Sequence, residues 1–364
     1  MNRKFLLTFS AALMALSMSA QNMVYTNAEA FPVYGKCVAK TTARYERLTP
    51  EVDSTVRPDV AWLGRNSAGL YVRFRTDSRR INARWTSLYG NHMNHQTLTG
   101  TRGLDLYALL EDGTWRSVNS ARPNPGSKET DTEVIANMDG KMREYMLYLS
   151  LYDGVTKLEI GVEEGAVLEG PAVDSPSSDR PIVMYGTSIL QGGCANRPGM
   201  AFTSILERRF NREVINLGFS GNAFLDLEIA QLMAQVENPA VYVLDHVPNT
   251  SPKMIDERGE TFFHILRTAH PDVPVIFVED PQFTHLYFDS QKQEEVASKN
   301  SRQKALFERL KKAGEKNIYY VKSEDLIGQD GEACVDGIHF TDLGMTRMAD
   351  AMMPSLKKAL KHCR

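Results

Sequence analysis

The sequence has little excess charge of either sign. Its 42 Lys and Arg residues nearly balance its 45 Asp and Glu residues, and the formal net charge of the 364-residue chain is −3. A face that binds nucleic acid or a membrane surface would need a marked excess of basic residues. We therefore expect no nucleic-acid partner.

Long hydrophobic runs are missing beyond the N-terminus. The chain starts with a basic segment at Arg3 and Lys4, followed by an apolar run over residues 5–18 and small residues before Gln21. This pattern predicts a signal peptide at residues 1–20, and the run is too short for a good transmembrane helix. We expect an exported protein, periplasmic or secreted, whose mature chain is not inserted in a membrane.

The first half of the chain lacks convincing amphipathic helices. Over residues 22–168 the hydrophobic segments are short, several alternate with a period of two, and turn residues separate them. Many short strands without helices predict an antiparallel β-sandwich or jelly roll, here over residues 21–170. A stretch rich in Pro, Ser and Asp at residues 171–181 reads as a linker.

The second half, residues 182–364, alternates between strand-like and helix-like segments. This alternation predicts a three-layer, doubly wound parallel sheet with helices on both faces. Ligands of such sheets bind beyond the carboxyl ends of the strands. The expected strands are residues 182–185, 214–217, 240–244, 273–278 and 318–321, and the expected helices are residues 199–210, 225–236, 252–269, 290–315 and 342–362.

Two short motifs about 150 residues apart contain the parts of a nucleophile system. Ser188 follows the first strand of the second half, and Asp336 and His339 lie three residues apart near the C-terminus. A serine hydroxyl needs a base to take its proton, and the imidazole needs a group that fixes its tautomer. Taken separately, a capping serine, a capping aspartate and a surface histidine explain the same residues.

Two further residues lie at strand ends on the same edge of the expected sheet. Gly221 follows the second strand and can lend its backbone N–H to an oxyanion, and the side-chain amide of Asn249 can donate to the same oxygen. The structural alternatives are a turn glycine and an Asx turn or helix cap. The combination with Ser188 favours catalysis.

This set of residues resembles the SGNH (GDSL-type) hydrolase family over roughly residues 180–364. Residues 186–188 (Gly-Thr-Ser) stand where the family has Gly-Asp-Ser. Gly221 and Asn249 match its oxyanion residues, and Asp336 and His339 match its final Asp-x-x-His. The resemblance implies that Ser188, His339 and Asp336 are catalytic.

The sequence differs from that family's pattern at two sites, and a second motif extends the resemblance into the N-terminal half. Thr187 replaces the usual aspartate, and Val247 and Thr250 replace the glycine and aspartate around Asn249. Residues 103–107 (Gly-Leu-Asp-Leu-Tyr) look like the GxDLY motif of a β-domain fused ahead of SGNH domains in exported bacterial proteins. We expect this motif to maintain the fold.

Several other residues are candidates for binding. Arg197 and Thr187 are candidate substrate-binding residues, with a salt bridge as the alternative for Arg197. The pair His92 and His95 has no Cys or acid at ligand spacing, so we expect a loop that reaches toward substrate and no metal site. His246 is a weaker base than His339, because the side chain of the preceding aspartate would point to the other face.

The chain has four cysteines, Cys37, Cys194, Cys334 and Cys363. Export would permit disulfides. Cys194 and Cys334 flank the two catalytic motifs, so they should lie close together if those motifs meet. A Cys194–Cys334 disulfide and free buried thiols are the two alternatives.

The sequence thus predicts an exported serine esterase that hydrolyses short-chain acyl esters without a cofactor. The expected substrates are acetyl esters on carbohydrate. The alternatives are a lipase or thioesterase of the same fold, and an inert module that binds glycan. The expected partner is a small-molecule or glycan ester, and the oligomeric state is left open.

Overall fold

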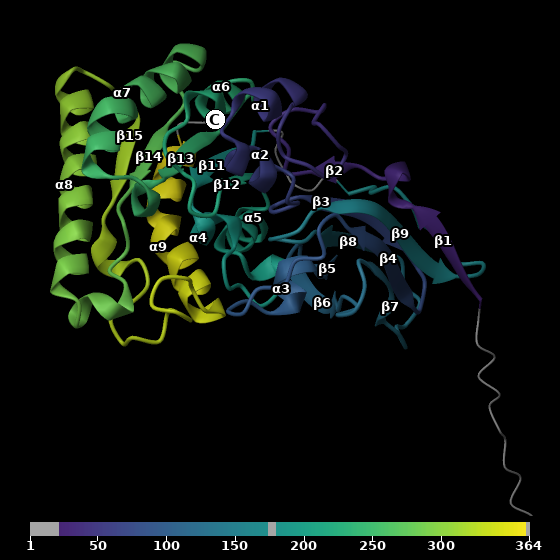
Figure 1. The fold of residues 1–364 in the computed structure, drawn as a ribbon. Coiled ribbons are helices and arrows are strands. Elements are labelled where there is room, and N and C mark those ends of the chain that lie inside the picture. The colour runs from purple at the N-terminus through teal and green to yellow at the C-terminus, as the bar shows by residue number, and fades with distance from the viewer. Residues whose placement is uncertain (1–21, 174–179, 362–364) are drawn as a thin grey trace, which may run out of the picture.

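The structure, a computed structural model, describes residues 22–173 and 180–361. The predicted signal peptide, Cys363, the central part of the expected linker (residues 174–179) and the last residue of the expected C-terminal helix lie outside the described residues. Figure 1 shows an N-terminal region of curved strands beside a C-terminal region of helices and parallel strands.

The N-terminal region is built from two antiparallel sheets. Its strands are β1 (Met23–Asn27), β2 (Val33–Tyr34), β3 (Tyr71–Thr76), β4 (Ile81–Ser87), β5 (Leu104–Leu109), β6 (Trp115–Ala121), β7 (Glu129–Ile135), β8 (Arg143–Tyr148), β9 (Val155–Glu163) and β10 (Leu168–Glu169). One sheet has the order β1-β9-β4-β7, and the other has the order β10-β3-β8-β5-β6, with β2 paired to β3. Phe74, Trp85, Leu106 and Ile160 from both sheets share one buried core, which confirms the predicted sandwich.

The expectation that no helix interrupts these strands was wrong. The region also contains η1 (Ala28–Ala30), α1 (Pro50–Thr55), α2 (Pro58–Gly64) and α3 (Leu98–Arg102). Thr49 caps α1 and Thr97 caps α3, each through its side-chain oxygen. These helices are seven residues or shorter, which is too short for helical periodicity to show in the sequence.

The C-terminal region is a five-stranded parallel sheet with the helices that cover it. Its strands are β11 (Ile182–Gly186), β12 (Val214–Gly218), β13 (Val241–Asp245), β14 (Val275–Val278) and β15 (Ile318–Val321). The order is β12-β11-β13-β14-β15, with every neighbouring pair parallel. This order confirms the doubly wound fold and puts a topological switch point beside β11, where such sheets bind ligands.

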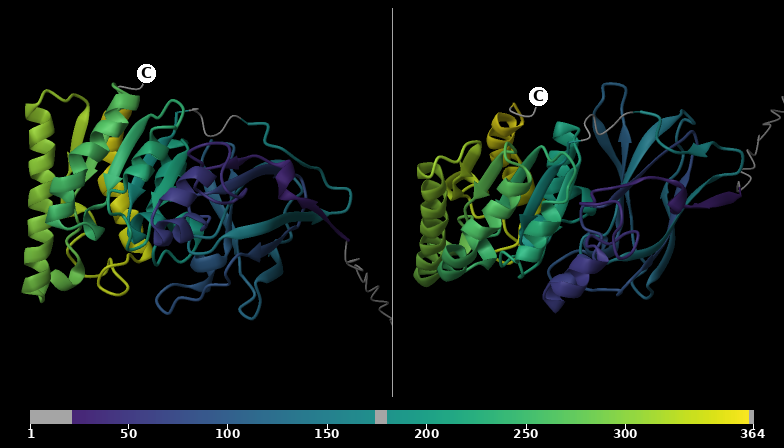
Figure 2. Two further views of the ribbon diagram at one scale, coloured as in Figure 1. Left: turned by 45° about the horizontal axis from the view of Figure 1, so that its top comes forward. Right: turned by 90° about the horizontal axis from the view of Figure 1, so that it is seen from above.

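Helices cover both faces of this sheet (Figure 2). They are α4 (Ser188–Gln191), η2 (Pro198–Met200), α5 (Phe202–Phe210), α6 (Leu227–Met233), η3 (Val247–Asn249), α7 (Pro252–Ala269), η4 (Thr284–Tyr287), α8 (Ser290–Lys312), η5 (Ser323–Asp325) and α9 (Asp342–Leu360). Along β11, Ile182 and Met184 pack with α4, α5 and α9, whereas Val183 and Tyr185 pack with α6 and α7. Both faces of the strand are therefore buried, which explains its continuous apolar run.

The segment before β3 belongs to both cores. Val52 of α1 and Val60 and Leu63 of α2 pack in the cluster that covers one face of the parallel sheet. Arg47 lies fully buried between them and donates hydrogen bonds to the backbone oxygens of Leu63 (2.6 Å) and Gly218 (2.8 Å). This segment therefore fixes the N-terminal region against the carboxyl end of β12. Among the residues that the structure covers, no helix has the length and apolar character to span a bilayer.

Candidate active site

Ser188, His339 and Asp336 are joined by hydrogen bonds at the carboxyl edge of the parallel sheet. The Nε2 atom of His339 lies 2.9 Å from the Oγ atom of Ser188, and its Nδ1 atom lies 2.7 Å from Oδ2 of Asp336. With the proton on Nδ1, the imidazole donates to Asp336 and accepts from the serine hydroxyl. This geometry allows the imidazole to remove the proton from Ser188.

The position of Ser188 follows from the strand and helix on either side of it. β11 ends at Gly186, and Ser188 is the first residue of α4. Thr187 is the N-cap of α4, because its side-chain oxygen accepts a hydrogen bond from the backbone N–H of Ile189. Thr187 is fully buried, and its hydroxyl shapes the turn that presents the nucleophile. Its candidate role in substrate binding stays a prediction.

The carboxylate of Asp336 is held in its ionised form. Partial burial opposes ionisation, but hydrogen bonds from the ring of His339 and from the backbone N–H groups of His339 and Ile338 bring the pKa of Asp336 down to about 2. The aspartate therefore carries a charge across the whole neutral range. A charged partner at Nδ1 fixes the tautomer of His339 and stabilises its protonated form.

Gly221 and Asn249 lie in the same cavity as Ser188. Gly221 has a φ of +67°, a conformation that a glycine adopts without strain, and no described residue accepts a hydrogen bond from its backbone N–H. The Oδ1 atom of Asn249 accepts from the backbone N–H of Ala223 (3.2 Å), which turns the amide so that its Nδ2 group is the free end. The backbone N–H of Ser188, in the first turn of α4, has no intrahelical acceptor. These three groups can donate to one oxyanion.

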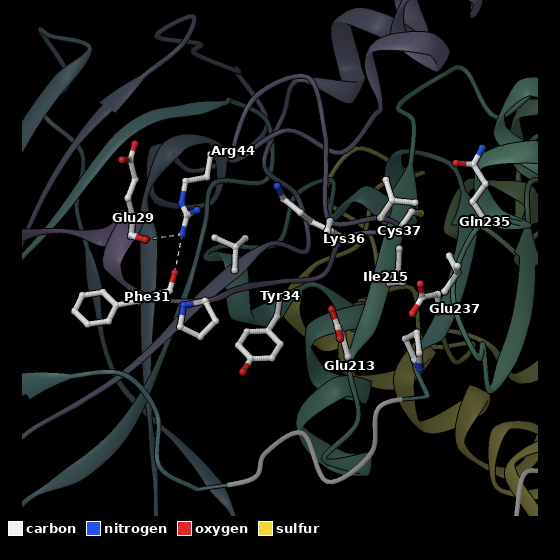
Figure 3. Close-up of a pocket in the computed structure, with 16 residues that line it drawn as sticks. Glu29, Phe31, Tyr34, Lys36, Cys37, Arg44, Glu213, Ile215, Gln235 and Glu237 are labelled. Carbon is white, nitrogen blue, oxygen red and sulfur yellow. Dashed lines mark hydrogen bonds between the residues drawn. The ribbon is translucent and has the colours of Figure 1, made fainter.

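This cavity has a volume of about 290 Å³. Apolar side chains of Phe283, Leu286 and Val296 form part of its wall, and Lys292, Glu295 and Lys299 of α8 form another part. Figure 3 shows a larger cavity of about 690 Å³ whose lining includes Pro181 and Glu213, the residues before β11 and β12. The larger cavity therefore lies at the amino edge of the sheet, away from Ser188.

Arg197 binds the GxDLY motif, which favours the salt bridge that was the alternative to its candidate role in substrate binding. Its guanidinium donates to Oδ2 of Asp105 (2.6 Å) and to the hydroxyl of Tyr107 (2.5 Å). Oδ2 of the buried Asp105 also accepts from the backbone N–H of Gly199. The motif therefore ties β5 to the loop that follows the nucleophile.

The structure also corrects the disulfide alternative. Cys194 and Cys334 are both free thiols: Sγ of Cys194 donates to the carbonyl oxygen of His95, and Sγ of Cys334 donates to the carbonyl oxygen of Ile338. The two residues do lie near the relay, as expected, but the sulfurs are directed to different acceptors. Burial, with nearby Asp336 and Cys334, raises the pKa of Cys194 to about 12.

Two other histidines, His246 and His95, have different surroundings. His246 is buried, and burial lowers its pKa to about 3, so it is a poor base. The ring of His95 lies 5.3 Å from the ring of His339. His95, Cys194, Asp336 and His339 each offer one ligand atom, and these atoms lie within 4.8 Å of one another. The pattern of ligand types suits Zn²⁺, but two of these residues, Asp336 and His339, already form the relay, so an ion there would disable it.

Sequence patterns did not indicate three residues that support the nucleophile. The hydroxyl of Tyr152, from the loop before β9, donates to the backbone oxygen of Ser188 (3.1 Å). Gln191 donates to the oxygen of Leu151 and accepts from the N–H of Ser220. At Gly193, a β-carbon would lie 2.9 Å from the ring of His339, so a larger residue would displace the base. A hydrogen bond between distant segments leaves no local signal in the sequence.

A parallel sheet with a hydrogen-bonded serine, histidine and aspartate at its carboxyl edge is an arrangement found in α/β enzymes that hydrolyse esters. Comparison with protein families agrees with this class. Residues 179–357 match the GDSL-like lipase/acylhydrolase family, and residues 23–168 match the N-terminal domain of SGNH-hydrolase-type esterases. No curated protein matches the chain.

Solved structures give the same result. A protein described as a GDSL-like lipase from Bacteroides ovatus is 35% identical, with a TM-score of 0.88 over 93% of this chain and 98% of that one. This chain belongs to the GDSL-like lipase/acylhydrolase family, and it is an ester hydrolase.

Two more distant structures share the fold. The salicylyl-acyltransferase SsfX3 from a tetracycline biosynthetic pathway is 16% identical (TM-score 0.70, covering 93% of this chain and 98% of that one). A family two carbohydrate esterase from Cellvibrio japonicus is 11% identical (TM-score 0.59, covering 94% and 100%). In both of them, the similarity extends over the N-terminal and the C-terminal regions of this chain.

Proposed function

We propose that this protein is an exported serine esterase that removes short acyl groups, acetyl groups above all, from carbohydrates. The observation that carries the proposal is the continuous hydrogen-bonded series from Ser188 through His339 to Asp336, with contacts of 2.9 and 2.7 Å. The basic and apolar residues 3–18 support export.

The reaction begins at the hydroxyl of Ser188. Its oxygen attacks the ester carbonyl carbon while its proton passes to Nε2 of His339, and the carbonyl oxygen becomes an oxyanion. The N–H groups of Ser188 and Gly221 and the amide of Asn249 donate hydrogen bonds to that oxyanion. The tetrahedral intermediate collapses, the protonated His339 gives its proton to the leaving alcohol, and the acyl group stays on Ser188.

Water completes the cycle. His339 takes a proton from a water molecule, whose oxygen attacks the acyl carbon. The second tetrahedral intermediate breaks the bond to Ser188, and the proton on His339 returns to the serine oxygen. The carboxylic acid leaves, so each cycle consumes one ester and one water.

The substrate class is supported by the cavity beside Ser188. At about 290 Å³, and with Lys292, Glu295 and Lys299 in its wall, it favours a short acyl group over a long apolar chain. This argues against a lipase or a thioesterase for long-chain acyl groups. A structure with the same fold over both regions of this chain is described as a carbohydrate esterase. This similarity supports a glycan as the alcohol part of the ester.

The test is the hydrolysis of p-nitrophenyl acetate by the wild type and by Ser188→Ala. We expect the variant to lose at least about 10⁴-fold in kcat, because among the described residues no other nucleophile is paired with His339. Equal rates in the two proteins would refute the mechanism, and an inactive wild type would favour a glycan-binding module. Acetate release from acetylated polysaccharides then tests the substrate.

A further inference from the structure

A second cavity adjoins the catalytic one, and much of its wall comes from the N-terminal region. Its volume is about 360 Å³, and Ser220 lines both cavities. The hydroxyl of Tyr152, another lining residue, donates to the backbone oxygen of the nucleophile, Ser188. The part of the wall that the N-terminal region supplies includes Asp59, Trp62, Asn91 and His92.

Trp62 forms an exposed aromatic surface in this cavity. Its neighbours Val60, Ala61 and Leu63 on α2 are buried, but Trp62 is 42% exposed. Its indole stacks on Tyr89, with 5.2 Å between ring centroids and an interplanar angle of 29°. Stacking covers one face of the indole and fixes the ring, so the remaining surface is available to a flat apolar partner.

The loop that faces Trp62 is held in place without a ligand. The carboxylate of the buried Asp153 accepts hydrogen bonds from the backbone N–H groups of residues 89, 90 and 91, at 2.8 to 2.9 Å. The ring of His92 contacts the oxygen of Gly90 (3.1 Å) and the guanidinium of the buried Arg102 (3.3 Å). A wall that is already ordered costs little conformational entropy when a ligand binds.

The charges around this cavity favour a neutral ligand that donates hydrogen bonds. Its lining contains the carboxylate of Asp59 and no Lys or Arg. The nearby Arg57 is engaged, because it donates to Asp226 (2.7 Å) and Asn222 (2.8 Å). An anionic ligand would be repelled by Asp59 without a compensating cation, whereas hydroxyl groups can donate to it.

We propose that this cavity binds the sugar ring of the ester, with the less polar face of the ring on Trp62 and its hydroxyl groups bonded to Asp59 and Asn91. A sugar ring has the required combination of a flat C–H face and hydroxyl donors, and its size suits the cavity. The inference rests on the proposed function, because it assigns the alcohol part of the proposed substrate to a place beside Ser188. The N-terminal region then contributes directly to specificity.

The experiment compares two kinds of ester in Trp62→Ala and Asp59→Asn. One is p-nitrophenyl acetate, which has no sugar, and the other is a panel of mono-O-acetylated methyl hexopyranosides and xylopyranosides. For Trp62→Ala we expect kcat/KM on the sugar esters to fall by at least about 10-fold, with less than about 2-fold change on p-nitrophenyl acetate. Asp59→Asn should weaken binding of the same esters, and Trp62→Phe should restore part of the loss.

Met142→Ala is the matched control, since Met142 is equally exposed (41%) on the N-terminal region but does not line this cavity. A second readout is the tryptophan emission of Ser188→Ala, which should shift when methyl glycosides are added. The emission of the double variant Ser188→Ala/Trp62→Phe should stay constant. Equal losses on both kinds of ester, or no loss on either, would overturn the sugar site. A wild type that cleaves p-nitrophenyl acetate but no sugar ester would instead refute the proposed substrate, and the sugar site with it.

Discussion

The C-terminal sheet and the N-terminal sandwich contribute to the same site in different ways. The carboxyl ends of β11, β12 and β13 lead directly to Ser188, Gly221 and Asn249. Ser188 can attack the ester carbonyl, and the other two can donate hydrogen bonds to the oxyanion. The sandwich supplies contacts that hold those loops, such as the hydroxyl of Tyr152 on the backbone of Ser188. A fused domain can therefore be part of an active site without supplying a reacting atom.

From this difference we expect that changes at the sheet edge reduce turnover, whereas changes at the contacts between the domains reduce stability or specificity.

The largest effect should come from the relay. Asp336→Asn removes the charge that fixes the tautomer of His339, so we expect kcat on p-nitrophenyl acetate to fall by about 10³–10⁴-fold. Thermal unfolding should change little, since Asp336 is partly exposed. An Asp336→Asn variant with wild-type kcat would show that this carboxylate has no role in the base.

The oxyanion donors should give the next largest effect. Asn249→Asp keeps the oxygen that accepts from Ala223 but replaces the amide donor, and Asn249→Ala removes both. We expect each to lower kcat by about 10²–10³-fold with a smaller change in KM, because the donor acts mainly on the charged intermediate. A change confined to KM would place Asn249 in ground-state binding.

A stability measurement tests the contact between the domains. Arg197→Ala leaves the buried Asp105 without its charged partner, and burial already raises the pKa of that carboxyl group. We expect a loss of about 2–4 kcal/mol in the free energy of unfolding, measured by urea denaturation. The control is Arg84→Ala at an exposed pair, with a loss of about 0–1 kcal/mol. If Arg197→Ala instead raises KM strongly at unchanged stability, the residue binds substrate after all.

The last prediction concerns the pH dependence of stability. Glu207 of α5 is fully buried against Tyr148 of β8, and burial raises its pKa to about 8. Between the unfolded value near 4.5 and about 8, the folded protein binds more protons than the unfolded chain. Its share of the stability is therefore complete at low pH and falls as pH rises, by up to about 1.4 kcal/mol per pH unit. Glu207→Gln should flatten this slope in melts from pH 5 to 8, and the exposed Glu257→Gln should not. An unchanged slope in Glu207→Gln would show that the group is ionised in the folded protein.

The difference between the two regions also explains what the sequence could predict. Strand ends of a parallel sheet meet at one edge, so Ser188, Gly221, Asn249 and His339 could be gathered from their order along the chain. Nothing local indicated that Arg197 pairs with Asp105, 92 residues away, because ion pairs between distant segments depend on tertiary packing.

The cysteines show another limit. Their proximity to the relay followed from the motifs, but a disulfide also requires a particular orientation of the two side chains. In the structure the thiol of Cys194 instead donates to His95. The short helices α1 to α3 were missed because five to seven residues carry too little periodicity.

Covalent labelling of the nucleophile tests the central claim most directly. The protein would be treated with a fluorophosphonate, digested and analysed by mass spectrometry, with Ser188→Ala and His339→Ala alongside. We expect one adduct, on the peptide that contains Ser188, with much slower labelling in His339→Ala and none in Ser188→Ala. An adduct on another residue, or an active wild type that is not labelled at Ser188, would contradict it.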